Sequence, residues 1–446
     1  MTASAAAPAD PGDRTTRERA RRAVYELADA PEPGDGSRYP PGRALSLADG
    51  HPGLALLFAE LSHTAPPDRR ERYRAAAHAH LAAAAAQVHT APTDGLFQGP
   101  PALAFAAHAA RHAPDDYARL LHRLDDFLAR RVHTLLTDEN ARLDAGRPGT
   151  RIAAYDVVSG ATGLGRLLLA RHPSAPHGPE AGLRATVRYL IRLSGPVRAH
   201  GRTVPGWWTP DGPSIRPEPA LPRGHLNFGL AHGIAGPLAL LALTRRAGLT
   251  EPGHDAAVTT FAEALAHQRR ADGQWAGVVP FDDYADGRDA DGRYPDHPHP
   301  DDGPASPRPV AARTAWCYGT PGAACALHLA AEALGRPDWS RTAVADLTTA
   351  LEAPRGVTDA GLCHGWAGLL HLTAHLARCS GDPHLTARAA ELAGRLLDAL
   401  ALSPQPRSVA HRTGLLDGAA GIALALHSWA ADAPPATAWD AALLIR

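Results

Sequence analysis

The chain has 446 residues, of which 45 are basic and 46 acidic, so its formal net charge at pH 7 is −1. This balance excludes nucleic acid and anionic membranes as partners attracted by net charge. No stretch approaches the roughly 20 apolar residues of a membrane span, and the N-terminal segment lacks the apolar core of a signal peptide. Four cysteines make no disulfide framework in so long a chain, and we expect a cytoplasmic protein.

Apolar residues make up 45% of the chain but aromatic residues only 5%, so the core must consist mostly of Ala, Leu and Val. Ala and Leu are strong helix formers, and the composition therefore favours helices before any pattern is considered.

A short glycine motif followed by an apolar helical segment recurs along the chain. Its first glycines are Gly50, Gly99, Gly160, Gly233, Gly319, Gly365 and Gly418. Six of the seven copies read Gly-x-x-Gly, whereas the second has Ala102 in place of the last glycine. Repeats of this kind indicate an architecture of stacked structural units.

A more polar segment with helical periodicity lies between successive motifs. The first begins at Thr15, where Thr15 and Glu18 form a capping box. The others span residues 70–88, 117–136, 180–193, 256–270, 340–351 and 385–400. Seven motif helices and seven intervening helices make 14.

An apolar helix must be buried on all sides, whereas an amphipathic helix can face water on one side. The alternation therefore predicts an all-α protein: a seven-fold α/α toroid with seven inner and seven outer helices. Ring closure leaves no unpaired terminal repeat. All seven motifs then lie at the N-termini of inner helices on one face, where the helix dipoles favour an anion such as a thiolate or an enolate.

We expect a disordered N-terminus at residues 1–14 and one toroid domain at 15–446. Two stretches fit no simple helix and predict long loop insertions, which can contain short strands, at about 194–227 and 272–312. The Asp-x-Asp-Gly at 289–292 lacks the other ligands of a calcium loop, and we interpret it as a solvated acidic loop.

Three consecutive motifs carry residues that can do chemistry. His232 precedes the first glycine of the fourth motif, Cys317 lies in the fifth, and Cys363 and His364 lie in the sixth. Two thiolates and an imidazole suit zinc, and three protein ligands leave a fourth position open, as in catalytic sites. The alternative interpretation is two buried free cysteines and a helix-capping histidine.

The remaining cysteines and a histidine pair receive structural interpretations. We expect Cys325 and Cys379 to be small core residues. His371 and His375 are four residues apart on a helix, and we interpret them as packing or surface residues.

At these residues the sequence resembles the lanthionine synthetase C family, the lanthipeptide cyclases. The resemblance rests on Gly-His-Leu-Asn at 224–227 leading into Gly-Leu-Ala-His-Gly-Ile-Ala-Gly at 229–236, on Trp-Cys-Tyr-Gly at 316–319 and on Cys-His-Gly at 363–365. It covers essentially the whole chain. It implies a seven-fold α/α toroid, in agreement with the interpretation of the repeats.

The resemblance also implies roles for individual residues. Cys317, Cys363 and His364 correspond to three zinc ligands, His232 to the acid/base residue, Asp156 to an acidic residue needed for activity, and Arg313 to an active-site arginine. Thr314 stands where related enzymes often have Asp. The implied reaction adds a peptide Cys thiol to dehydroalanine or dehydrobutyrine, and His232 either donates or accepts a proton.

Four hypotheses follow. The first is a cyclase that acts on a dehydrated ribosomal precursor peptide supplied by a separate dehydratase. The second is a related enzyme that adds glutathione to dehydroamino acids, and the third is a zinc-stabilised scaffold that only binds peptide. The fourth is another α/α-toroid enzyme, such as a prenyltransferase or a glycosidase; a glycosidase would need two inward carboxylates, from Asp49, Asp156 and Asp417.

Overall fold

The computed structural model describes residues 11–29, 42–88, 95–174, 179–213, 218–270, 272–287, 313–402 and 413–446. The acidic motif at 289–292 and residues 1–10 of the expected N-terminal tail lie outside these ranges. The first helix begins at Pro11, four residues before the expected start at Thr15. Among the described helices, none combines the length and the apolar character that crossing a membrane requires.

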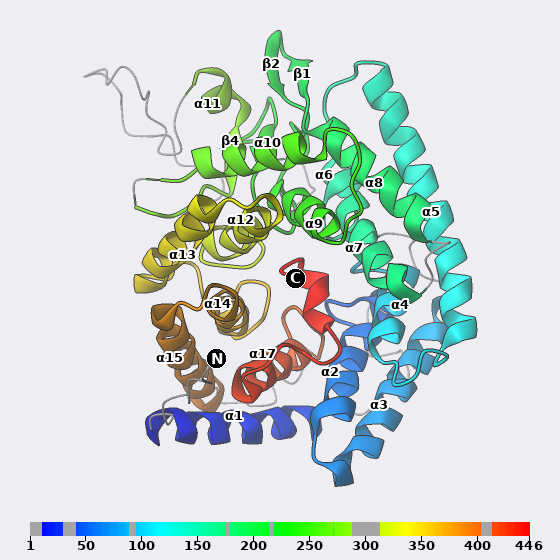
Figure 1. Ribbon diagram of the computed structural model, residues 1–446, viewed down its shortest axis with the longest axis vertical. Helices are drawn as coiled ribbons and strands as arrows, with labels where there is room; N and C mark the ends of the chain where they lie inside the picture. The colour runs from blue at the N-terminus through cyan, green and yellow to red at the C-terminus, as the bar shows by residue number, and fades with distance from the viewer. Residues whose placement is uncertain are drawn as a thin grey trace, which may run out of the picture.

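Two sets of seven long helices alternate along the chain and form two concentric rings (Figure 1). The inner ring consists of α2 (His51–Thr64), α4 (Pro100–Ala109), α7 (Ala161–Arg171), α9 (Ala235–Arg246), α12 (Thr320–Leu334), α14 (Trp366–Ser380) and α17 (Ala419–Ala431). The outer ring consists of α1 (Pro11–Asp29), α3 (Pro67–Ala86), α5 (Ala118–Asp144), α8 (Pro179–Leu193), α10 (His254–His267), α13 (Pro337–Glu352) and α15 (Pro383–Leu402). The seven-fold α/α toroid that the repeats predict is confirmed.

The burial of the two sets follows their sequences. In α2 and α17 nearly every residue is buried, whereas α3 buries only Tyr73, Ala77, His80, Leu81 and Ala84. Each inner helix packs against its inner neighbours, and α17 packs against α2, so the ring closes. Helix α1 completes the outer ring by packing against α17 and α15.

A closed circle of backbone hydrogen bonds joins the seven loops that precede the inner helices. Each loop donates one N–H to the next loop, between residues that lie two or three positions before the first glycine of their motifs. The seven junctions are Leu47 N to Phe97 O, Phe97 N to Val158 O, Val157 N to Ala231 O, Ala231 N to Cys317 O, Trp316 N to Cys363 O, Leu362 N to Leu416 O, and Leu415 N to Leu47 O. This circle fixes the motifs at one face of the ring, which we call the motif face.

The last glycine of the motif faces the backbone of its own loop. A Cβ on this glycine would overlap the carbonyl oxygen of the residue six positions earlier or press closely against it, and this holds for Gly53, Gly163, Gly236, Gly322, Gly368 and Gly421. The Gly-x-x-Gly pattern therefore reflects close approach of the helix start to the loop that precedes it.

We expect Gly53→Ala to destabilise the toroid by about 1–3 kcal/mol, because its Cβ would lie 2.9 Å from Leu415 N and closer still to Leu47 O. Gly394→Ala is the matched control: no atom lies within 4 Å of its added Cβ in α15. This control should gain about 0.4–1 kcal/mol. Denaturant unfolding of both variants measures the two effects, and equal stabilities would contradict this account of the motif.

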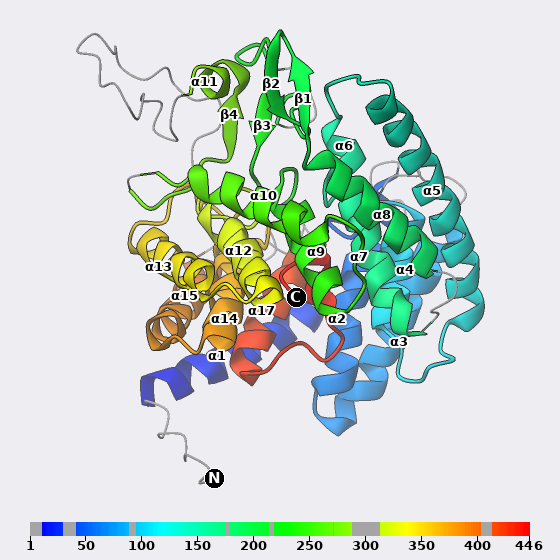
Figure 2. The same ribbon diagram turned by 45° about the horizontal axis from the view of Figure 1, so that its top comes forward.

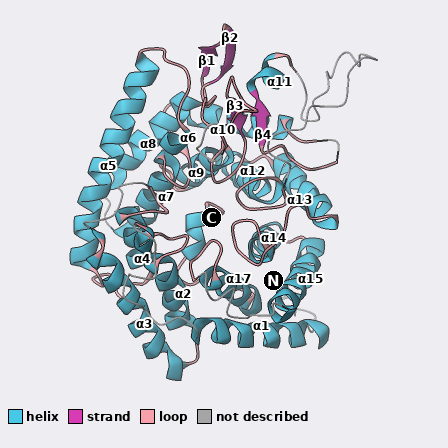
Figure 3. Ribbon diagram, turned by 180° about the vertical axis from the view of Figure 1, so that it is seen from behind, coloured by secondary structure: helices cyan, strands magenta, loops and turns pink. Residues whose placement is uncertain are grey.

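The insertion at 194–227 and the described part of the insertion at 272–312 contain short strands. Strands β1 (Pro196–Ala199) and β2 (Arg202–Pro205) form an antiparallel hairpin. Strand β3 (His225–Asn227) pairs with β4 (Val278–Pro280), which leads into α11 (Phe281–Ala285). All four strands lie together at one edge of the ring, beside α10 (Figures 2 and 3).

The last described residues run into the centre of the ring (Figure 1). The 3-10 helix η5 (Trp439–Leu443) is fully buried and contacts α7, and Trp316 donates its indole N–H to Leu443 O at 3.0 Å. Asp440 accepts a hydrogen bond from His371 of α14 at 3.2 Å. These C-terminal residues therefore fill part of the interior of the ring.

Candidate metal centre and its acid–base pair

Equivalent positions of successive repeats bring the candidate site residues together. Cys317 and Cys363 each lie two residues before the first glycine of their motif, at the position whose carbonyl accepts a bond of the backbone circle. His232 and His364 each lie one residue before that glycine. Because the circle holds these positions in register, residues far apart in the sequence meet on the motif face.

Cys317, Cys363 and His364 form a cluster that suits a metal ion. One ligand atom from each residue lies within 4.8 Å of the other two, and among the described residues no other such group of His, Cys, Asp and Glu occurs. Cys317 is buried, and the other two are half-buried. Two sulfurs and one imidazole nitrogen at these separations fit the donor set of a tetrahedral site with one protein-free position.

The cluster already carries charge. The pKa of Cys317 is lowered to about 5, mainly by a hydrogen bond from the Cys363 thiol and also by His364 and Arg313, although burial acts in the opposite direction. The pKa of Cys363 is raised, because it donates that bond and is buried beside the Cys317 thiolate. The pKa of His364 is raised to about 10 by Asp359 and then by Cys317. These shifts favour the thiolate form of Cys317 and the imidazolium form of His364.

A carboxylate–imidazole pair lies beside the cluster. His232 Nδ1 donates to Asp156 Oδ2 at 2.6 Å, and Asp156 is completely buried. The other carboxylate oxygen, Oδ1, accepts the backbone N–H groups of Ser159 and Gly160 at 2.7 and 2.8 Å. One carboxylate thus caps its own motif loop and orients the histidine of the next motif.

The pKa of His232 is raised above its ordinary value. Burial alone would lower it, but the hydrogen bond and charge of Asp156 and the charge of Cys317 outweigh the burial. The imidazolium form of His232 therefore persists to higher pH than that of a free histidine.

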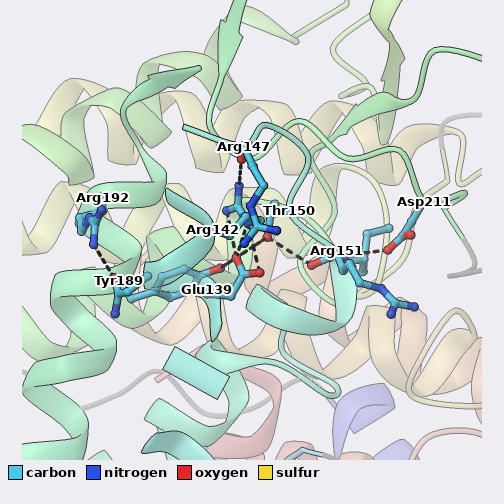
Figure 4. A network of polar contacts seen from close by, with 10 residues as sticks. Glu139, Arg142, Arg147, Thr150, Arg151, Tyr189, Arg192 and Asp211 are labelled. Carbon is cyan, nitrogen blue, oxygen red and sulfur yellow. Dashed lines mark hydrogen bonds and ion pairs between the residues drawn. The ribbon is translucent and has the colours of Figure 1, made fainter. Parts of the chain in front are cut away.

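A polar network holds the backbone that leads to Asp156 (Figure 4). Buried Glu139 of α5 accepts hydrogen bonds from Thr150 Oγ1 at 3.0 Å and Tyr189 OH at 2.9 Å, and it pairs with Arg142 at 2.9 Å. Asp211, from the first insertion, accepts the N–H of the first residue of α6 (Ile152–Tyr155) at 3.0 Å. Asp156 follows α6 directly, so both anchors fix its position.

Arg313 and Thr314 begin the loop that carries Cys317. Arg313 is exposed, its side chain lies beside Gly356, and its positive charge lowers the pKa of Cys317. Thr314 exchanges two hydrogen bonds with the backbone of Arg355: its N–H donates to Arg355 O, and its Oγ1 accepts from Arg355 N, both at 2.9 Å. The threonine thus joins this loop to the loop before α14.

Two residues to which the sequence analysis gave no role also lie at the site. Asp359 pairs with His364 at 3.0 Å, and Asn227 donates to the Tyr318 hydroxyl at 2.9 Å while accepting the Gly229 N–H. Asp359 and Asn227 each lie six residues before the first glycine of their motif. This position holds a different residue type in most of the other repeats, so the repeat pattern alone did not mark it.

The structural predictions for the other cysteines and histidines are confirmed in part. Cys325 is buried as expected, but Cys379 is exposed, so its prediction as a core residue is wrong. It lies in the last turn of α14, where the helix has left the core, and its sulfur is 3.6 Å from His375 Nε2. His371 is a packing residue, buried against Asp440.

Comparisons with known proteins concern the sequence and the fold of the whole chain. The nisin biosynthesis protein NisC of Lactococcus lactis subsp. lactis is 23% identical over 337 residues, which cover 74% of this chain and 72% of that protein. A solved structure of a nisin cyclase superposes with a TM-score of 0.75 at 20% identity, over 97% of this chain and 98% of that one, and so shares the fold. The family described as lanthionine synthetase C-like protein matches residues 43–444, a span that includes all seven motifs, and the chain belongs to this family.

Proposed function

We propose that this protein is a zinc-dependent lanthipeptide cyclase. It adds the Cys thiols of a dehydrated precursor peptide to dehydroalanine or dehydrobutyrine in the same peptide, which forms lanthionine and methyllanthionine rings. The observation that carries the proposal is the convergence of Cys317, Cys363 and His364 within 4.8 Å beside the His232–Asp156 pair. The similarity to NisC and to a nisin cyclase supports the same reaction class.

Cys317, Cys363 and His364 would hold the zinc ion. A substrate thiol with an ordinary pKa of about 8.5 is mostly protonated at pH 7. Bound zinc would favour its thiolate form. The cluster supplies two sulfur ligands that donate charge, and burial of Cys317 keeps water from that side. The substrate thiol would release its proton to water as its sulfur approaches the dehydroamino acid, and His232 would regain a proton from water after the addition.

The His232–Asp156 pair and Arg313 carry out the remaining steps. The sulfur forms a bond to the β-carbon, and the electron pair of the carbon–carbon double bond moves toward the carbonyl oxygen to give an enolate. Arg313 stabilises the negative oxygen. His232, kept protonated by Asp156, donates its proton to the α-carbon and completes the thioether.

The substrate class implies a second protein. Dehydroamino acids arise when Ser or Thr of the precursor loses water, and the proposed chemistry of this site performs addition alone. A separate dehydratase therefore supplies the peptide.

The test incubates the zinc-loaded protein with a dehydrated Cys-containing peptide and, in a second arm, with glutathione and a dehydroalanine peptide that lacks Cys. We expect free thiol to disappear in the first arm with no change in peptide mass, because cyclisation is an isomerisation. Addition of glutathione alone would favour the glutathione-transferring alternative. Full zinc occupancy with no thiol loss in either arm would overturn the proposal in favour of a peptide-binding scaffold.

A further inference from the structure

Asp359, like Asp156, accepts a backbone N–H of its own loop with one carboxylate oxygen and contacts an imidazole with the other, but its partner His364 belongs to the metal cluster. Its Oδ1 accepts the Gly361 N–H at 2.8 Å, and its Oδ2 lies 3.0 Å from His364 Nε2. Its backbone carbonyl also accepts the Trp366 N–H at 3.0 Å. The carboxylate is therefore fixed by its own loop on one side and engages an imidazole on the other.

We propose that Asp359 is a positioning residue for the metal centre: it accepts the Nε2–H of His364 and leaves Nδ1 as the nitrogen that binds the metal. The inference rests on the metal site of the proposed function, but on no step of the reaction. Histidine ligands usually donate their second N–H to a carboxylate or carbonyl, which fixes the tautomer and the ring orientation.

The loop geometry explains why this role falls to Asp359. A Cβ at Gly365 would press against Asp359 Oδ1, so the glycine lets the carboxylate sit beneath the motif loop. His364 lies immediately before that glycine and directly after Cys363. Because Cys363 and His364 are neighbours, the backbone conformation that orients the cysteine side chain also limits where the imidazole can lie. The fixed carboxylate of Asp359 then selects one orientation of the imidazole ring.

Asp359→Asn is the decisive variant. An asparagine keeps Oδ1 as the acceptor of the Gly361 N–H, so the loop cap survives. Its Nδ2 then faces His364 Nε2 and donates to it, which places the imidazole proton on Nδ1 and blocks that nitrogen. A purely structural role would tolerate this change, whereas a positioning role would not.

The experiment measures metal affinity without any peptide. Metal-free protein is titrated with zinc sulfate against a chromophoric chelator, and with cobalt(II), whose thiolate absorption reports ligation. We expect Asp359→Asn to bind zinc about 10- to 100-fold more weakly than the parent protein. Asp359→Glu should recover part of the loss, since it restores a carboxylate.

Asp272→Asn is the matched control, because it removes a similarly exposed carboxylate that pairs with Arg355 at 2.8 Å on the same side of the ring. It should leave the zinc affinity unchanged. Unfolding of the metal-free proteins checks that Asp359→Asn retains its fold. Unchanged zinc affinity in Asp359→Asn overturns the inference, whereas failure of the parent protein to bind zinc overturns the proposed function instead.

Discussion

Cys363→Ala loses both the metal and ring formation. Removing one of three protein ligands leaves Cys317 and His364, which lack the donor set of a stable zinc site. The thiol of the substrate then keeps its ordinary pKa, and we expect thioether formation to fall by about 10³-fold or more at pH 7, a barrier increase of about 4 kcal/mol. Zinc content by atomic absorption and loss of free thiol on a dehydrated peptide measure the two effects on one preparation.

The chain offers a matched control for this variant. Cys379 is exposed near the end of α14, the helix that begins just after Cys363. Cys379→Ala removes one thiol from the same repeat without touching the cluster, and it should keep both its zinc and its rate. A Cys363→Ala protein with one tightly bound zinc per chain, or one that closes rings at the parental rate, would show that the cluster is not the reactive centre.

The fold was readable from the sequence because its defining feature is local. In six of the seven motifs, a Cβ on the last glycine would overlap or press against the carbonyl six residues earlier in the same repeat, so the constraint recurs in the sequence as Gly-x-x-Gly. The alternation of apolar and amphipathic segments is equally local. The intervening helices were predicted with small errors at their ends; the largest is α5, which continues to Asp144 although its predicted segment ends at residue 136.

The circle of backbone hydrogen bonds could not be predicted from the sequence. Its donors and acceptors lie in different repeats and use main-chain atoms, which leave no trace in residue identity. The same holds for Asp211, which reaches α6 from an insertion with no repeat pattern. Cys379 was misassigned because helical position alone does not say where an inner helix leaves the core.

The candidate metal ligands were predictable because they lie at equivalent positions of successive motifs. Of the two carboxylates that contact the site histidines, only one was predicted. Asp156 was found through the family resemblance, and its contact with His232 crosses from one repeat to the next. Asp359 shares a repeat with its histidine but lies outside the short motif. A ligand is visible as a residue type, whereas its orientation depends on loop geometry.

Asp156→Asn separates the charge of this carboxylate from its role as a loop cap. Asparagine Oδ1 still accepts the N–H groups of Ser159 and Gly160, but the charge that raises the pKa of His232 is gone. Burial then dominates and lowers that pKa. If His232 acts as an acid, activity is present while its imidazolium persists and is lost as the pH rises through its pKa.

The basic limb of the pH–rate profile should therefore move to lower pH in Asp156→Asn. At pH 8 the rate of ring formation should fall by about 10²- to 10⁴-fold, the range of general acid catalysis. Single-turnover rates between pH 5.5 and 9.5 on one dehydrated peptide measure both quantities. A limb that stays in place, or moves to higher pH, would rule out a protonated His232 as the acid.

Asp211→Ala, which removes the acceptor of the Ile152 N–H, distinguishes a shift in the pKa of His232 from a displaced Asp156 carboxylate. Asp211 holds the N–H of Ile152 and makes no contact with the imidazole of His232, so its loss loosens α6 and the residue that follows it. We expect a lower rate at every pH with the basic limb unmoved. Only Asp156→Asn removes the charge beside His232, so a basic limb that moves in this variant and not in the Asp211 variant assigns the pH dependence to that charge.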